Sequence, residues 1–332
     1  MAPESGWRTM FSALRSPNYR YFYTGQTVSL IGTWTRTAAL GWVSFQFTHS
    51  ELLLGIVFIL NTLPVFLFSI YAGALADRVP KIRMFTLTSW FSLLSSLTLA
   101  VMLFNGPVHI GYLMAFSCLW GLSTTFEMPS RQTLKVELVG RKDLVNAIAL
   151  NSAMVNSARV IGPAIGGLLL ASFGAAWCFL LDATCYLAVL YAIHRIELPA
   201  SHYAKGNVNA DWRYTLEGFK YLRTNSIIGR AVVLLFVIGL GGWAYQSQLS
   251  AFVVTQLNMG AEGYGLILTL NGLGACTAAL LVAAKGSDLV RVRTLYVGSG
   301  IFGVFISLFG LMHGPLGPGR SLTFVREHSL DR

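Results

Sequence analysis

Two long apolar runs, residues 52–72 and 84–104, are separated only by a short charged stretch, GALADRVPKIR, at 73–83. A run of about 20 apolar residues crosses a bilayer as an α-helix, because lipid offers no hydrogen-bond partners and a helix satisfies its own backbone. Two such runs so close together predict an antiparallel pair of membrane spans joined by a tight charged loop.

The composition extends this prediction to the whole chain. Hydrophobic residues make up 54% of the sequence and charged residues 11%, whereas soluble globular proteins contain about 25% charged residues. We therefore expect an all-α polytopic membrane protein, a bundle of helices surrounded by the lipid bilayer. Nine candidate spans cover roughly residues 20–47, 52–74, 84–105, 108–129, 144–171, 176–196, 226–252, 262–284 and 294–312.

Lysine and arginine occur on alternate connections between these spans. They precede the first span and follow the second, fourth, sixth and eighth, whereas the other connections contain none. Because basic connections stay in the cytoplasm, we expect a multi-pass protein of the cell (inner) membrane with a cytoplasmic amino terminus. The net charge of +10 then reflects membrane topology, and we expect no nucleic-acid partner. The basic residues at the span ends include Arg8, Arg15, Arg20, Arg78, Lys81, Arg83, Arg131, Lys135, Arg141, Lys142, Arg195, Arg230, Lys285, Arg291 and Arg293.

The spans divide into two groups. We expect a six-helix amino-terminal half at 1–198, a cytoplasmic linker at 199–225, a partial carboxy-terminal half at 226–312 and a polar, disordered tail at 313–332. Apolar residues of the linker recur at helical spacing, which predicts an amphipathic helix on the membrane surface. These residues are Trp212, Leu216, Phe219 and Leu222.

The charged stretch has a weak echo later in the chain, AAKGSDLVRVR at 283–293, which indicates a duplicated architecture. Two repeats of six spans each would need three more spans than the sequence contains. Either the protein ends naturally after nine spans or the chain is shortened. We favour shortening, because nine spans would place a tail with three arginines outside the cell, against the positive-inside rule.

Three ionisable residues lie well inside the expected spans: Arg36, Arg159 and Asp182. A charge near the bilayer centre costs about 2.5–3.5 kcal/mol on insertion scales, so each should face a partner or a cavity. One interpretation pairs Arg159 with Asp182 and fixes the packing of two helices. Another places Arg36 and Arg159 in a central cavity whose positive charge suits a carboxylate, catecholate or phosphate. Asp182 is also a candidate for proton uptake and release, since coupling to a proton gradient needs a titrating group within the membrane.

Polar residues accompany both arginines on their helices. Gln26 and Thr33 lie at helical spacing from Arg36, so we expect this face of the first helix to meet water. Asn156 lies three residues before Arg159 on the same face. Together these residues and Asp182 form the expected substrate cavity or coupling site.

The fifth expected span continues as RVIGPAIGG at 159–167. Gly162, Gly166 and Gly167 share one side of the helix, where small residues let two helix backbones approach closely. Pro163 removes one backbone hydrogen bond and bends the helix. We expect a helix-packing motif here.

Several strings resemble known transporters. The charged stretch resembles the signature between the second and third helices of the major facilitator superfamily. Three other strings resemble the transmembrane secretion effector branch of that superfamily, which includes enterobactin exporters: LRSPNYRYFYTGQTVSLIGTW near the start, FEMPSRQTLKVELV at 126–139 and NAIALNSAMVNSARVIGP from residue 146. The resemblance covers residues 14 to about 312 and implies a helix bundle of the major facilitator type.

The resemblance also implies residue roles. Asp77 and Arg131 would belong to a cytoplasmic gating network, and Arg159 would match an arginine that the branch carries before its Gly-Pro signature. The branch leads us to expect Gln where this chain has Arg36. The residues assigned to the gating loop are Gly73, Asp77, Arg78, Lys81, Arg83 and Arg131.

The leading functional expectation is a secondary transporter that works by alternating access and exports a small organic molecule, such as a siderophore or drug, in exchange for protons. The alternative is a truncated, transport-inactive membrane remnant or regulatory partner of a transporter. A membrane enzyme is disfavoured, because the sequence has no HExxH, GxSxG, Walker-type or dinucleotide-binding motif. We expect no cofactor and no metal site.

Overall fold

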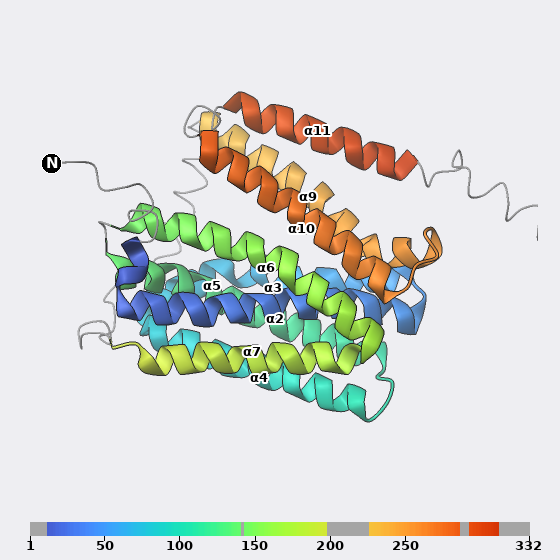
Figure 1. Cartoon of the computed structure of the whole chain (residues 1–332), viewed down its shortest axis with the longest axis horizontal. Helices are drawn as coiled ribbons and strands as arrows, with labels where there is room; N and C mark the ends of the chain where they lie inside the picture. Colours follow the sequence, from blue (N-terminus) through green and yellow to red (C-terminus); the bar gives the residue numbers. More distant parts are fainter. Residues whose placement is uncertain (1–11, 141–142, 198–225, 286–291, 312–332) are drawn as a thin grey trace, which may run out of the picture.

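The computed structural model of the chain describes residues 12–140, 143–197, 226–285 and 292–311, and it contains only helices and their connections in these ranges. Nine helices of 20 residues or more occupy them, one at each predicted span, so the all-α class is confirmed (Figure 1). A short 3-10 helix, η1 (Ser12–Arg15), precedes them. The nine are α2 (Pro17–Thr48), α3 (Glu51–Arg78), α4 (Lys81–Phe104), α5 (Ile110–Val139), α6 (Leu144–Ser172), α7 (Ala175–Arg195), α9 (Ser226–Thr255), α10 (Ala261–Lys285) and α11 (Val292–Leu311).

Three predictions lie outside the described residues. These are the amphipathic helix at 199–225, the tail at 313–332 and the central part of the weak echo, 286–291.

The charged stretch between the first two apolar runs is shorter as a loop than the sequence indicated. Gly73 to Arg78 continue α3, and Lys81 begins α4, so only Val79 and Pro80 connect the two helices. The carbonyl of Pro80 accepts hydrogen bonds from the first turn of α4. The connection between α3 and α4 is therefore a tight two-residue turn.

Length and composition alone identify four stretches of the described chain as able to cross a bilayer: Glu51–Ala76, Lys81–Phe104, Leu144–Ser172 and Ala175–Arg195. Helices α2 and α5 are more polar, and their hydroxyls bond to neighbouring helices. Thr35 of α2 donates to the carbonyl of Gly162 at 2.9 Å. Ser117 of α5 donates to the carbonyl of Val57 at 2.7 Å. Protein groups thus supply the hydrogen bonds that lipid cannot.

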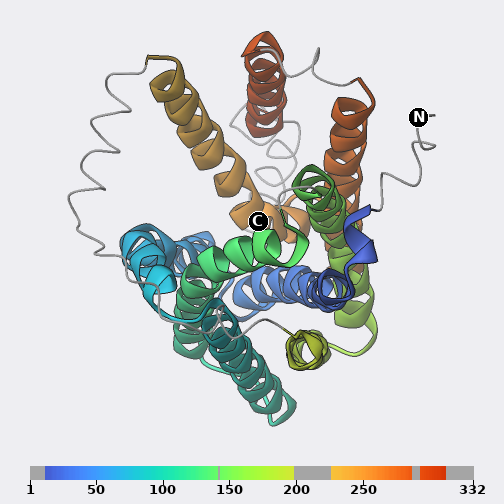
Figure 2. The same ribbon diagram turned by 90° about the vertical axis from the view of Figure 1, so that its left-hand side faces the viewer.

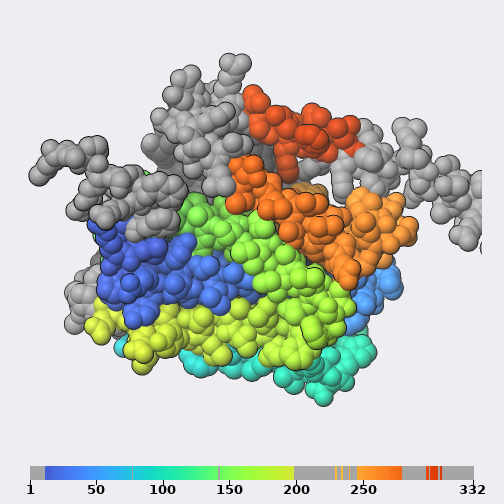
Figure 3. All heavy atoms as spheres, viewed as in Figure 1, coloured from blue at the N-terminus to red at the C-terminus, as the bar shows by residue number. Residues whose placement is uncertain are grey.

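Helix α2 runs through the middle of the six-helix group α2–α7 and packs most closely on α7 and α6 (Figures 1 and 2). Two glycines permit the contact with α7. A Cβ atom added at Gly25 would lie 2.7 Å from the Cβ of Ala192, and one added at Gly32 would lie 2.8 Å from the Cβ of Cys185. The two helices therefore lie side by side along their length (Figure 3).

Apolar clusters close both ends of this group. One cluster, with Tyr19 and Phe85, lies at the end that holds the α3–α4 connection, which we call the loop end. The other cluster includes Trp120 and Phe179, whose rings stack with centroids 5.8 Å apart. Polar side chains occupy the layer between the clusters.

The helices α9–α11 lie on one side of the six-helix group (Figures 1 and 2). Helix α10 packs chiefly on α6, and α9 contacts α3 and α2. Ser250 of α9 donates to the carbonyl of Gly41 at 2.9 Å, near the carboxy-terminal end of α2. Between α6 and α10, a Cβ atom at Gly167 would lie only 2.6 Å from the Cα of Gly265.

The Gly-Pro segment of α6 leads to a stability prediction. A Cβ atom at Gly162 would lie 2.4 Å from the Cβ of Trp34 and 2.8 Å from the carbonyl oxygen of Ile31. Gly162→Ala should force α2 and α6 apart and lower the melting temperature of the purified protein in detergent, since overpacking costs about 1–3 kcal/mol.

The matched control is Gly274→Ala, because Gly274 is also helical and has no atom within 4 Å of an added Cβ. This variant should melt at or slightly above the wild-type temperature. Equal melting temperatures for the two variants would contradict a tight α2–α6 contact at Gly162.

Candidate functional site

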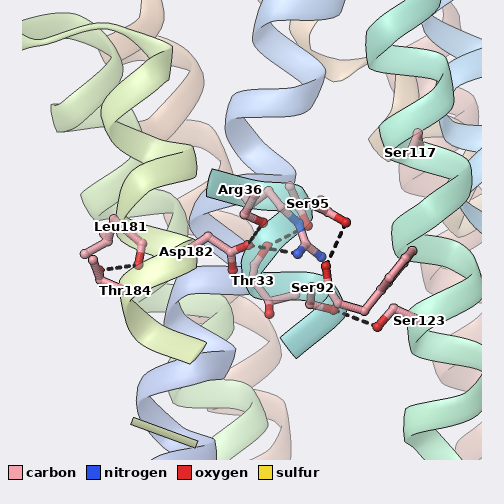
Figure 4. A network of polar contacts seen from close by, with 12 residues as sticks. Thr33, Arg36, Ser92, Ser95, Ser117, Ser123, Leu181, Asp182 and Thr184 are labelled. Atoms are coloured by element: carbon pink, nitrogen blue, oxygen red, sulfur yellow. Dashed lines mark hydrogen bonds and ion pairs between the residues drawn. The ribbon is translucent and has the colours of Figure 1, made fainter. Parts of the chain in front are cut away.

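Arg36 and Asp182 form an ion pair between α2 and α7 (Figure 4). The Arg36 Nη1 atom lies 2.9 Å from Asp182 Oδ2, and the two side chains are 7% and 0% exposed. Ser96 of α4 donates to the same carboxylate oxygen at 2.6 Å. The Arg36 guanidinium also lies 4.4 Å from the ring centroid of Trp120 in α5. The interpretation that paired Asp182 with Arg159 is therefore wrong.

A second buried carboxylate lies near this pair. Glu127 of α5 bonds to Arg131, one turn further along the same helix, at 3.2 Å. Glu127 is also within electrostatic reach of Arg36 and Asp182. Two cations and two anions thus neutralise one another inside the six-helix group, and Arg36 adds no surplus positive charge.

Hydroxyl groups line the α4 side of this network. The Ser92 and Ser123 hydroxyls hydrogen-bond to each other at 2.7 Å (Figure 4). Ser123 also donates to the carbonyl of Thr88 at 3.1 Å. The second carboxylate oxygen of Asp182 is buried without a hydrogen-bond partner within the described part of the chain. The Oδ1 atom of Asp182 is therefore able to accept a further hydrogen bond.

The polar stripe of α2 lies inside the protein. Gln26 is 2% and Ser29 is 3% exposed, and Thr33 is half-buried. The expectation that this face of α2 meets water is wrong at Gln26 and Arg36, because α7, α6 and α5 pack around α2.

Arg159 of α6 has a different environment. Its guanidinium lies 5.1 Å from the ring centroid of Trp34, and its Nε atom is buried without a hydrogen-bond partner among the described residues. No carboxylate of the described ranges pairs with it. Asn156, one turn earlier, donates to the carbonyl of Ser152 on its own helix.

The carboxy-terminal helices approach Arg159 directly. A Cβ atom at Gly272 of α10 would lie 2.6 Å from the carbonyl oxygen of Arg159. Tyr245 of α9 is within electrostatic reach of the Arg159 guanidinium, and its hydroxyl accepts a hydrogen bond from Asn271 of α10. Arg159 is thus a half-buried cation where α2, α6, α9 and α10 come together.

The gating residues assigned by resemblance fall into separate contacts. Lys81 bonds to Glu137 of α5, with 3.4 Å between Nζ and Oε1. Arg131 bonds to Glu127 on its own helix. The side chain of Asp77 lies outside the described residues. Burial, and secondarily the charge of Arg131, lowers the pKa of Lys135 at the loop end of α5.

The glycines of the α6 motif contact two different helices. Gly162 and Gly166 lie against α2, and Gly167 lies against Gly265 of α10. Pro163 is inside α6 and is buried.

Sequence reasoning missed Glu127, Glu137, Trp120 and Ser96. Glu127 lies two residues before the expected end of its span, where a carboxylate looks like an exposed helix terminus. Its burial follows from the continuation of α5 to Val139, which leaves Glu127 well inside the helix. Within the described residues, no cluster of His, Cys, Asp or Glu is arranged to hold a metal ion.

Long apolar helices packed around buried, paired charges define a polytopic helical membrane protein, in which such charges mark a candidate functional site. The profile of the transmembrane secretion effector family matches residues 8–312, and the chain belongs to this family of the major facilitator superfamily. Membership of this family makes the protein a transporter and not an enzyme, as expected from the sequence.

Curated relatives agree with this assignment. The staphyloferrin A transporter of Staphylococcus aureus is 27% identical over 302 residues, covering 88% of this chain and 73% of the relative. The enterobactin exporter EntS of Shigella flexneri is 26% identical over 321 residues, covering 93% and 73%. The multidrug efflux pump Tap of Mycolicibacterium fortuitum is 25% identical over 303 residues, covering 84% and 74%.

The Arg36–Asp182 ion pair leads to a double-mutant prediction. Arg36→Met should destabilise the protein by about 3–5 kcal/mol, because it leaves a buried carboxylate unpaired. Arg36→Met combined with Asp182→Leu should recover most of this loss. The measurement is the thermal unfolding of the four proteins in one detergent.

Arg195→Met is the control, because Arg195 is exposed at the end of α7 and should tolerate the same change. Additive effects of the two core substitutions would show that the pair contributes no coupling energy.

Proposed function

We propose that the protein is a secondary transporter of the cell (inner) membrane that exports a small organic molecule in exchange for protons. Its amino-terminal half, 1–198, and its partial second half, 226–312, would rock about a central cavity, with the linker 199–225 and the amino terminus in the cytoplasm. Each of the nine long helices in the described residues would cross the membrane. This proposal is supported by the similarity of the chain to an enterobactin exporter, a multidrug efflux pump and a staphyloferrin A transporter.

The observation that carries the proposal furthest is the position of Arg159. It is a cation without a carboxylate partner in the described chain, and α9 and α10 reach it from the opposite half. A charge in this position costs free energy unless a ligand or water compensates it. We assign Arg159 to the substrate cavity, together with Asn156, Thr33 and the aromatic rings of Trp34 and Tyr245.

This assignment favours an anionic substrate. A catecholate or carboxylate would bond to the guanidinium, and an aromatic part would stack on Trp34. The names of two relatives contain the siderophores enterobactin and staphyloferrin A, which makes them suitable first probes.

We assign proton coupling to Asp182 and the network around it. Protonation of the carboxylate would weaken the bond to Arg36 and so loosen α7 from α2. Ser96 would keep its hydrogen bond to this carboxylate without adding charge, and Gln26, ten residues before Arg36, would belong to the buried polar stripe of the same helix. The alternative function, a transport-inactive remnant or regulatory partner, predicts no coupled flux at all.

The test is flux in proteoliposomes that contain the purified chain in inverted orientation. An acidic lumen should drive uptake of enterobactin or staphyloferrin A, and Asp182→Asn should abolish the dependence on the pH gradient. Uptake no greater than in empty vesicles, for both siderophores and for the cationic dye ethidium, would favour the transport-inactive alternative.

Arg159 leads to a specificity prediction. Arg159→Gln should reduce the uptake of anionic probes about tenfold or more, because a hydrogen bond to a charged group contributes about 1.5–3 kcal/mol. Ethidium uptake should change little. The effect should appear chiefly in KM.

The control is Arg195→Gln, which removes one exposed charge far from this site. It should change the uptake of neither the anionic probes nor ethidium. Equal losses for anionic and cationic probes in Arg159→Gln would indicate a structural role for Arg159.

A further inference from the structure

A groove opens between α3 and α4 near the loop end, with α5 as its floor. Its volume is about 510 Å³, within the range of about 300–1,000 Å³ found for small-ligand pockets. Helix α3 packs mainly on α5, and α4 packs on α7 and α5, so the two helices bordering the groove have little contact with each other. The lining residues are Leu75, Val79, Met84, Leu87, Thr88, Phe91, Leu122, Ser123 and Phe126.

The wall of this groove is mostly apolar and is suited to binding a hydrocarbon chain. Its two hydroxyl groups are already used, because Thr88 donates to the carbonyls of Met84 and Phe85 and Ser123 bonds to Ser92 and Thr88. The rim faces outward through Leu87, which is 68% exposed. A polar ligand would find no free partner here, whereas an acyl chain would bury apolar surface.

Two arginines flank the groove at the loop end. Arg78 lies three residues after Leu75 on α3, and Arg83 lies four residues before Leu87 on α4, so each shares a helix face with a lining residue. Both are exposed, and neither is paired with a carboxylate within the described part of the chain. Lys81, between them, is already bonded to Glu137.

We propose that this groove binds one membrane phospholipid with an anionic headgroup. An acyl chain occupies the apolar groove, and the headgroup phosphate lies between Arg78 and Arg83, which have no carboxylate partner among the described residues. The bound lipid bridges α3 and α4. The site is separate from the proposed substrate cavity, and it requires only that the chain is embedded in a membrane.

The test is native mass spectrometry of the full chain released from detergent, with titrated phosphatidylglycerol, phosphatidylcholine or glycerol phosphate. The wild-type protein should retain one phosphatidylglycerol in preference to phosphatidylcholine and should not retain glycerol phosphate. Arg78→Gln combined with Arg83→Gln should weaken retention of phosphatidylglycerol about 30-fold, as expected for two arginines beside an anionic surface. Leu122→Trp, which fills the groove, should displace both phospholipids.

The control is Arg20→Gln combined with Arg195→Gln, which removes two exposed arginines at the same end of the bundle but outside the groove. It should retain phosphatidylglycerol like the wild type. An equal loss in the control, equal retention of the two phospholipids by the wild type, or retention of glycerol phosphate would overturn the proposal. Because the readout is lipid retention, a failure of the proposed transport function would not affect it.

Discussion

One buried ion pair, Arg36 with Asp182, fixes where four helices of the bundle meet. Each charge alone would be costly in a layer that lipid and apolar side chains surround, so α2 and α7 are bound to lie where the two groups meet. Ser96 brings α4 to the same carboxylate, and Trp120 places an α5 ring over the guanidinium. Four helices thus converge on one pair of charges.

The two arginines of the interior have different roles for a physical reason. Arg36 is neutralised within the six-helix group, whereas Arg159 faces α9 and α10 without a carboxylate in the described chain. A neutral network can hold helices together without a ligand. Arg159 has the Trp34 ring beside it, and in the proposed transporter an anionic ligand or water would compensate its charge. In the proposed transporter, the Arg36–Asp182 pair would couple proton binding to the packing of α7 on α2, and Arg159 would bind the substrate.

The number and order of the helices could be predicted from the sequence, because the hydrocarbon thickness fixes the length of an apolar run. The exact ends of the helices could not be predicted in this way. Gly73 to Arg78 and the last ten residues of α5 remain helical after the apolar run stops, since hydropathy marks the edge of lipid rather than the end of hydrogen bonding. Arg36, Arg159 and Asp182 could be found from the sequence, but the buried Glu127 and the pairing of Asp182 with Arg36 could not. The position of Asp182 in the sequence gives its depth in the membrane. Its pairing with Arg36 depends on which helix lies beside α7, and the sequence does not show this.

The contact of Gly167 with Gly265 differs in kind from the other helix contacts. Glycine stands on both sides of this contact, so no side chain separates the two backbones and the helices approach closely. A larger residue at either position would have to push α6 and α10 apart. Two residues without side chains therefore set the distance between the six-helix group and the helices that follow it.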